Sequence, residues 1–199
     1  MSLFPMFLKL EGRTCLVLGA GSVGEPKIRS LLQAGAEVRV VAPCVTAAVK
    51  GWSERGILTW HKRNFAAEDL EGVFLVIAAT NSREVNEEIF REAQRRKILC
   101  NAVDEPEHCD FYYPAVVRRG QLQLAISTGG QSPALAQRLR RQLEKQFSRE
   151  YAGWVDRLGS ARRKLQTSPL ELEVKKRQLH ELASQQAFEA ARRAPGEIS

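Results

Sequence analysis

Three glycines, Gly19, Gly21 and Gly24, stand between an apolar run and a helical pattern, and no other feature restricts the fold of this chain as strongly. The run TCLVLGA at residues 14–20 is typical of a buried strand, and residues 25–34 have the pattern of a helix. A G-x-G-x-x-G turn in this setting is the phosphate-binding turn of dinucleotide-binding folds. The first glycine allows the tight turn, the second lets the backbone approach a pyrophosphate, and the third allows close helix–strand packing. The alternative is a glycine-rich turn with a structural role only.

Short apolar runs and helical patterns continue to alternate as far as residue 104. The predicted strands are residues 37–43, 57–62, 73–80 and 98–104, and the predicted helices are residues 46–55 and 85–96. Strands separated by helices form parallel sheets with helices on both faces. The sequence therefore predicts an α/β fold with a Rossmann-type parallel sheet.

The pattern changes near Tyr113. Residues 111–117 and 121–127 are two strand-like runs, and the Arg-Arg-Gly segment at 118–120 favours a hairpin between them. Ser132 and Pro133 then open a helix as its cap and its first residue. From there the pattern is helical, and the capping-box spacing of Ser168 and Glu171 predicts that a helix restarts and runs to about Arg193.

The end of the second predicted strand lacks the acidic residue that usually contacts the ribose 2′-hydroxyl of a dinucleotide. Pro43 and Cys44 stand there, so backbone groups at these residues could approach the ribose, and the choice between NAD and NADP stays open. We expect the cofactor contacts at the ends of three predicted strands, from Gly19, Gly21, Ser22, Val23, Gly24, Pro43, Cys44, Thr80 and Asn81.

Composition narrows the class of protein. The hydrophobic fraction is 44% and the charged fraction 27%, values that fit a globular chain and exclude a disordered one. No apolar run reaches the roughly 18–20 residues that cross a bilayer, and the N-terminus does not have the pattern of a secretory signal. We therefore expect a cytoplasmic protein that does not bind membranes.

The four cysteines are Cys15, Cys44, Cys100 and Cys109, and no two of them have the spacing of a zinc site or a disulfide framework. Two of them, Cys15 and Cys100, stand in apolar, strand-like runs. Reduced, mostly buried thiols are the expectation, and no metal site is predicted.

The net charge is +7, and its excess belongs to the C-terminal third. Residues 137–199 hold 14 Lys+Arg and 8 Asp+Glu. Such a surface suits a nucleic acid or a polyanionic small molecule, or is a solvated helical face. We expect no nucleic acid, because the basic residues show neither a helix-turn-helix pattern nor interleaved aromatic residues.

Several sequence blocks together resemble the precorrin-2 dehydrogenase and sirohydrochlorin ferrochelatase family of siroheme synthesis. The blocks are FPMF with Leu10, residues 16–24 with Glu25 and Lys27, Gly35-Ala36 with residues 40–43, AATN at 78–81 with Val85-Asn86, NAVDEP at 101–106, Cys109-Asp110-Phe111 with Pro114-Ala115, and AISTGGQSP at 125–133 with Leu135-Ala136. The chain departs from the family at Gly24, often alanine there, and at Pro26, often arginine.

The resemblance implies a homodimer that oxidises precorrin-2 to sirohydrochlorin with NAD, and in some members also inserts Fe²⁺. It implies an NAD-binding Rossmann domain at residues 1–113, a small α+β dimerisation region at residues 114–147 and a helical region at residues 148–199. Some members carry a further methyltransferase domain. The expectation is that this chain lacks it and depends on another enzyme for precorrin-2.

One acidic residue is the candidate catalytic group. Dehydrogenation removes a hydride and a proton, and metal insertion removes two pyrrole protons, so one carboxylate beside the ring could serve both reactions. Asp104 ends a predicted strand, at the edge where ligand crevices form, and the resemblance implies the same residue. The alternative is a strand-end turn former. His108 and Asp110 are weaker candidates for a catalytic role. The alternative for His108 is a solvated side chain in a loop, and the alternative for Asp110 is a cap or turn before Phe111.

A second turn is a candidate substrate site. Its small residues lead into the helix that begins at Pro133, and backbone and hydroxyl donors there could hold substrate carboxylates. The candidates are Ser127, Thr128, Gly129, Gly130 and Ser132, and a capped turn with no ligand is an equal alternative. Some relatives have a phosphorylatable serine at Thr128. One or two of Arg138, Arg140, Arg141 and Arg149 could pair with further carboxylates.

A non-catalytic NAD-sensing module with a basic helical tail is the competing function. The blocks at residues 101–106 and 125–133 argue against it, because a sensor needs no second anion site beside the nicotinamide. Appearance of sirohydrochlorin from precorrin-2 and NAD separates the two functions.

Overall fold

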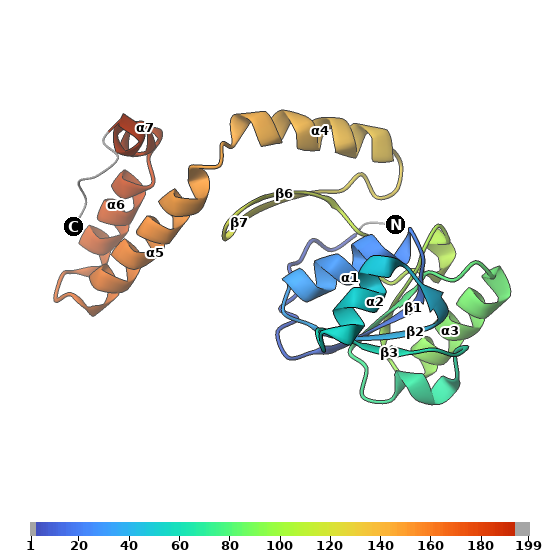
Figure 1. Ribbon diagram of the computed structural model, residues 1–199. Helices are drawn as coiled ribbons and strands as arrows, with labels where there is room; N and C mark the ends of the chain where they lie inside the picture. The colour runs from blue at the N-terminus through green and yellow to red at the C-terminus, as the bar shows by residue number, and fades with distance from the viewer. Residues whose placement is uncertain (1–2, 194–199) are drawn as a thin grey trace. The chain divides into compact units, whose positions relative to one another are not determined.

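A computed structural model describes residues 3–193 (Figure 1). The chain divides into two compact units, of which the first ends at Tyr112 and the second begins at Tyr113. The finer division of the second unit at residue 147 stays a prediction. Within the described part of the chain, no helix is both long enough and apolar enough to cross a membrane.

The first unit is built on one parallel sheet of five strands in the order β3-β2-β1-β4-β5. The strands are β1 Thr14–Ala20, β2 Glu37–Val45, β3 Thr59–His61, β4 Leu75–Ala78 and β5 Leu99–Ala102. The helices are α1 Gly24–Gln33, α2 Ala47–Glu54, α3 Arg83–Arg95 and the short 3₁₀ turns η1 Ala67–Leu70 and η2 Pro106–His108. This arrangement confirms the predicted Rossmann-type sheet.

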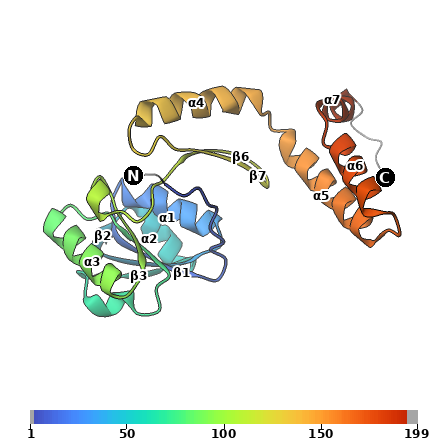
Figure 2. The same cartoon turned by 180° about the vertical axis from the view of Figure 1, so that it is seen from behind.

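Helices cover both faces of the sheet. The chain moves outward from β1 in one direction through β2 and β3, and in the other through β4 and β5, so right-handed crossovers place α1 and α2 opposite α3 (Figures 1 and 2). On the α3 face, Ile89 and Ala93 pack on alternate residues of β1, Leu16 and Leu18. The order reverses between β1 and β4, where ligands of such sheets bind.

The predicted strands at 57–62 and 73–80 are shorter at both ends in the structure, and the second and last strands of the sheet also end elsewhere than predicted. β2 continues past Pro43 to Val45, because its pairing with β1 shifts register and an irregular ladder tolerates a residue without an N–H. The predicted strand at 98–104 stops at Ala102, because Asp104 has a φ of +62°, which no strand contains.

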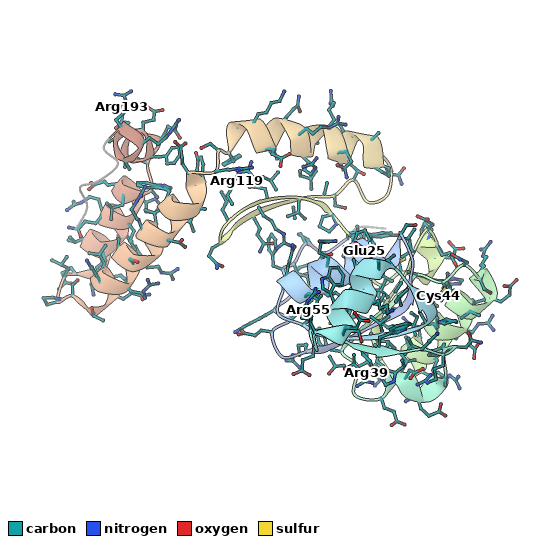
Figure 3. The ribbon with its side chains drawn as sticks, in the orientation of Figure 1. Glu25, Arg39, Cys44, Arg55, Arg119 and Arg193 are labelled. Carbon is teal, nitrogen blue, oxygen red and sulfur yellow. The ribbon has the colours of Figure 1, made fainter. Side chains whose placement is uncertain are left out.

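The second unit starts with an antiparallel hairpin, β6 Ala115–Arg119 and β7 Leu122–Ile126, followed by α4 Pro133–Gln146. The hairpin is confirmed, but its first strand begins at Ala115, and its turn is residues 120–121 in place of the predicted 118–120, because Arg118 and Arg119 pair in the ladder. Arg119, labelled in Figure 3, donates to the carbonyl oxygens of Glu144 and Phe147 over 2.8 and 2.7 Å. It thereby places a cation on the last carbonyls of α4.

Three further helices complete this unit: α5 Tyr151–Thr167, α6 Leu172–Leu182 and α7 Gln185–Arg193. The predicted capping box at Ser168 is wrong, because the Ser168 hydroxyl donates to the carbonyl of Leu165 in the preceding helix and α6 begins only at Leu172. The predicted single helix to Arg193 is also interrupted, and Ser184 caps α7 by accepting from the Ala187 N–H over 3.1 Å.

An aromatic cluster closes the helical part of this unit. The ring of Phe188 on α7 lies 4.2 Å from the ring of Tyr151 and 5.7 Å from that of Trp154, both on α5. Phe188 and Trp154 are buried although most of their neighbours on these helices are exposed. The cluster therefore supplies the apolar contact that holds α7 against α5.

Candidate functional site

The three glycines of the turn after β1 have three different surroundings. A Cβ on Gly19, whose φ is +85°, would lie 2.3 Å from the carbonyl oxygen of Ala79, at the end of β4. A Cβ on Gly24 would lie 2.3 Å from the carbonyl oxygen of Gly19. A Cβ on Gly21 would meet nothing within 4 Å, so the backbone there faces open space. Two glycines are needed for packing and the third leaves room for a ligand, as a pyrophosphate requires.

The start of α1 fits the same ligand. Its N-cap residue, Val23, makes no side-chain cap hydrogen bond, and the Glu25 N–H donates to the Gly21 carbonyl over 3.0 Å. Ser22 and Val23 are exposed. Backbone N–H groups and the positive end of the helix dipole are the donors that a phosphate group needs.

The other predicted cofactor residues stand at the neighbouring strand ends. The β1–β2 ladder pairs Ala20 with Val45, so Pro43 and Cys44, whose side chains are exposed, lie at the edge where the glycine turn begins. Thr80 is half-buried and Asn81 exposed directly after β4. The geometry brings the predicted residues to one edge of the sheet, and their contacts with a cofactor stay a prediction.

Asp104 lies in the turn after β5 at the same edge, two residues beyond the strand that was expected to contain it. Its side chain is exposed, and its left-handed backbone is unusual for a residue other than glycine. Burial lowers the pKa of Lys27 on α1, and the negative charge of Asp104 opposes this lowering. The Asp104 carboxylate thus acts on Lys27 through its charge.

A buried network beside Asp104 was not predicted. Asn86 is 4% exposed, and its side-chain amide donates to Glu105 Oε1 over 2.9 Å. Glu105 Oε2 lies 2.8 Å from His108 Nδ1, and the His108 ring packs on Phe90 with centroids 5.0 Å apart. One signal was available in the sequence: Asn86, Ile89 and Ala93 have the spacing of one helix face, and a polar residue on an apolar face needs a partner.

His108 therefore pairs with the carboxylate of Glu105. The expectation that its side chain is solvated is wrong. In residues 3–193 no group of three or more His, Cys, Asp and Glu side chains is placed to hold a metal ion.

Asp110 has a structural role. Its carboxylate accepts from the backbone N–H of Cys100 over 2.9 Å and from the side chain of Gln94 over 2.9 and 2.8 Å.

Burial raises the pKa of Cys15 to about 11, and burial together with the Asp110 charge raises that of Cys100 to about 12. Both thiols stay protonated, and all four cysteines are free, as expected.

The second candidate turn connects β7 to α4 in the second unit. Ser127 Oγ accepts from the Gly129 N–H over 3.1 Å, and Thr128 Oγ1 accepts from the Ser132 N–H over 3.0 Å. Ser132 caps α4 as predicted, by accepting from the Leu135 N–H over 3.2 Å. Each hydroxyl keeps its own O–H as a donor, so the turn is rigid and still able to bind a carboxylate. Its substrate role stays a prediction.

The arginines near this turn differ in their partners. Arg140 pairs with Glu144 over 2.7 Å, and Arg141 Nε donates to the Gln137 carbonyl over 3.4 Å. Arg138 and Arg149 are exposed.

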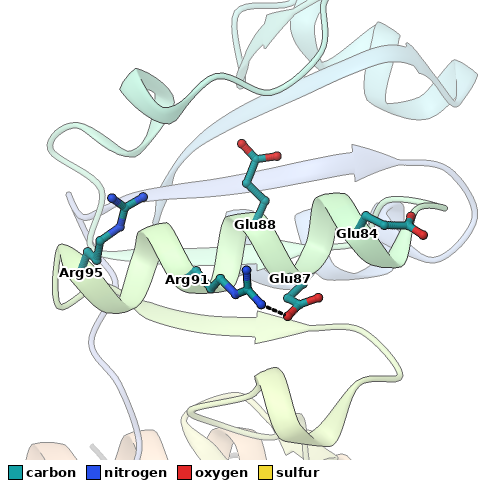
Figure 4. Close-up of a pocket in the computed structure, with 5 residues that line it drawn as sticks. All are labelled: Glu84, Glu87, Glu88, Arg91 and Arg95. Carbon is teal, nitrogen blue, oxygen red and sulfur yellow. Dashed lines mark hydrogen bonds and ion pairs between the residues drawn. The ribbon is translucent and has the colours of Figure 1, made fainter.

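A surface hollow of about 370 Å³ on α3 is lined by acidic and basic side chains alike (Figure 4): Glu84, Glu87, Glu88, Arg91 and Arg95. Arg91 pairs with Glu87 and Arg95 with Glu92 along the helix, and three of the five lining residues are acidic, so this hollow offers no anion site.

Comparison with known proteins decides the family. An NAD(P)-binding family model matches residues 6–115, and the model described as "Sirohaem biosynthesis protein central" matches residues 119–146. The solved structure titled "SirC, precorrin-2 dehydrogenase" superposes with a TM-score of 0.81 at 31% identity, over 94% of this chain and 92% of that one. The chain belongs to the precorrin-2 dehydrogenase family of siroheme biosynthesis.

Two siroheme synthases are similar to this chain over part of their own length. Siroheme synthase 1 of Aeromonas hydrophila is 38% identical over 172 residues, which are 86% of this chain and 37% of that protein. Siroheme synthase 1 of Serratia proteamaculans is 43% identical over 144 residues, 72% of this chain and 30% of that protein. The chain thus spans about a third of the length of these relatives. The family resemblance and the nicotinamide dinucleotide cofactor predicted from the sequence are confirmed.

Proposed function

We propose that this chain oxidises precorrin-2 to sirohydrochlorin with NAD as the oxidant. The observation that carries the proposal is the shared edge of the sheet, at which the open glycine turn and Asp104 both lie. The match to a precorrin-2 dehydrogenase over nearly the whole of both chains supports the same reaction.

The residues at this edge of the sheet have different roles in the proposed reaction. Bound NAD would supply the hydride acceptor for oxidation of the tetrapyrrole. Gly21 and the first amides of α1 hold the pyrophosphate, and Pro43, Cys44, Thr80 and Asn81 line the dinucleotide on either side. Asp104 accepts the proton, because it is an exposed carboxylate at that edge and carboxylates are common general bases.

The tetrapyrrole carries several carboxylates, and the second unit offers donors for them. The rigid turn at residues 127–132 supplies hydroxyl and backbone donors, and the exposed Arg138 and Arg149 supply cations. We infer that these groups bind the substrate, and that modification of Thr128 would weaken its binding by adding negative charge.

Three further properties belong to the proposal. The chain acts in the cytoplasm, as expected from the sequence. It acts as a homodimer, because the hairpin of β6 and β7 has only two strands and leaves Leu122, Leu124 and Ile126 half-exposed. It also inserts Fe²⁺ into its product, as some members of the family do, with Asp104 accepting the two pyrrole protons one after the other and releasing each to solvent.

The test is an anaerobic assay with precorrin-2, NAD and either the native chain or Asp104→Asn. The amide keeps the shape of the carboxylate and loses its basicity, so turnover should fall by roughly 10²–10⁴, the scale of one general base. NAD affinity should not change. Full turnover of Asp104→Asn would refute the base assignment, and NAD binding by the native chain without turnover would favour the NAD-sensing module. Sirohydrochlorin with Fe²⁺ in the same assay tests metal insertion.

A further inference from the structure

A chain of hydrogen bonds joins the ends of β4 and β5. The Thr80 hydroxyl donates to Asn86 Oδ1 over 2.7 Å, and Asn86 Nδ2 donates to Glu105 Oε1 over 2.9 Å. The other oxygen of Glu105 faces His108 Nδ1 at 2.8 Å. These hydrogen bonds thus connect Thr80, at the cofactor edge of the sheet, with Glu105, which directly follows Asp104.

The side chains in this hydrogen-bond network are largely shielded from solvent. The side chain of Glu105 is 11% exposed and that of His108 15% exposed. Burial raises the pKa of Glu105, but the hydrogen bonds from Asn86 and His108 outweigh it, so the pKa lies below its ordinary value. Glu105 therefore stays ionised at neutral pH, and both its oxygens are occupied by groups of α3 and η2.

The backbone of the Asp104 turn is the part that needs such support. Asp104 holds a φ of +62°, a conformation that costs an L-residue about 1–2 kcal/mol. On its two sides the Glu105 N–H donates to Ala102 over 3.3 Å and the His108 N–H donates to Glu105 over 2.9 Å. A strained residue persists where its surroundings fix it, and Glu105 is the anchor next to it in sequence.

We propose that Glu105 is a positioning residue, which holds the Asp104 carboxylate in register with the cofactor edge through Asn86 and Thr80. This inference rests on the proposed function. Its physical basis is that a displacement of about 1 Å at a reacting group can lower a rate by roughly 10²-fold.

The first experiment compares Glu105→Ala with Glu107→Ala. Glu107 is two residues away, carries the same charge and pairs with Arg83 over 2.8 Å at the surface, so it controls for the loss of one charge in this turn. Arg83 Nε also lies 4.0 Å from Glu105 Oε2, so this arginine keeps a partner in either variant. Glu105→Ala should lower kcat about 10–100-fold and leave the affinity for NAD unchanged, and Glu107→Ala should change kcat less than about twofold. Circular dichroism shows whether each variant is folded, and Glu105→Gln, which keeps the shape, serves if the alanine variant is not.

A double-mutant cycle with Asp104→Asn separates positioning from a general loss of structure. If Glu105 acts through Asp104, then Glu105→Ala should cost almost nothing further once Asp104 is Asn, so the two effects are strongly non-additive. Additive losses would overturn the proposal.

Amide hydrogen exchange gives a readout that does not depend on activity. Glu105→Ala should speed exchange of the N–H groups of residues 105 and 108 about tenfold or more, and Glu107→Ala should not. Unchanged exchange and unchanged kcat in Glu105→Ala would refute the positioning role. A native chain that fails to oxidise precorrin-2, with the exchange result as expected, would refute the proposed function and leave the mechanical role of Glu105 standing.

Discussion

Replacing Gly21 by alanine separates binding from stability at the glycine turn. The added methyl group would meet nothing within 4 Å, and the φ of Gly21 lies outside the left-handed range. Gly→Ala at such a site stabilises a protein by about 0.4–1 kcal/mol, because the unfolded chain loses freedom. For a unit of this size the melting temperature should stay the same or rise by up to about 4 °C.

The same methyl group stands where the pyrophosphate is expected to approach the backbone. The affinity for NAD should therefore fall at least about tenfold, or ~1.4 kcal/mol. Calorimetric titration with NAD measures the affinity, and thermal unfolding without ligand measures the stability. Unchanged affinity in a folded Gly21→Ala chain would refute the assignment of this turn to the pyrophosphate.

Two other glycines calibrate this result. Gly19→Ala places a methyl group 2.3 Å from the Ala79 oxygen at a φ of +85° and should cost about 2–5 kcal/mol. Gly72, at the opposite edge of the sheet, also has a positive φ, but an added Cβ has nothing within 4 Å. Gly72→Ala should cost only about 1–2 kcal/mol and leave NAD affinity unchanged.

Two further predictions follow from the fold and the assembly. Burial raises the pKa of Asp69, but the Arg63 guanidinium and the Ala66 N–H outweigh it and hold the pKa below its ordinary value of 3.8. The carboxylate therefore stabilises the first unit above that pH and ceases to do so as the pH falls through the lowered pKa. Asp69→Asn should cost about 1.5–3 kcal/mol in urea unfolding at pH 7 and progressively less as the pH falls below 3.8, and a cost that does not decrease with falling pH would contradict this role. Light scattering at micromolar concentration should give the mass of a dimer, and a fully active monomer would refute the assembly.

The glycine turn could be predicted from the sequence because its information is local. A strand, three glycines and a helix follow one another within 21 residues, and each glycine has its own steric reason. The network at Asn86 and Glu105 could not be predicted in the same way, because 19 residues separate its partners and only the pairing of β4 with β5 brings them together.

Local patterns also failed where a side chain had a choice of partner. Ser168 has the spacing of a cap for the following helix, but its hydroxyl bonds to the helix before it. The left-handed turn at Asp104 has no signal of its own, since aspartate occurs in strands' ends and in turns alike.

The central claim is that this chain transfers a hydride from precorrin-2 to NAD. The most direct measurement is the anaerobic absorbance of NADH and sirohydrochlorin in one reaction of the native chain with precorrin-2 and NAD. The two products should appear together in equal amounts. NAD binding with neither product formed would contradict the claim.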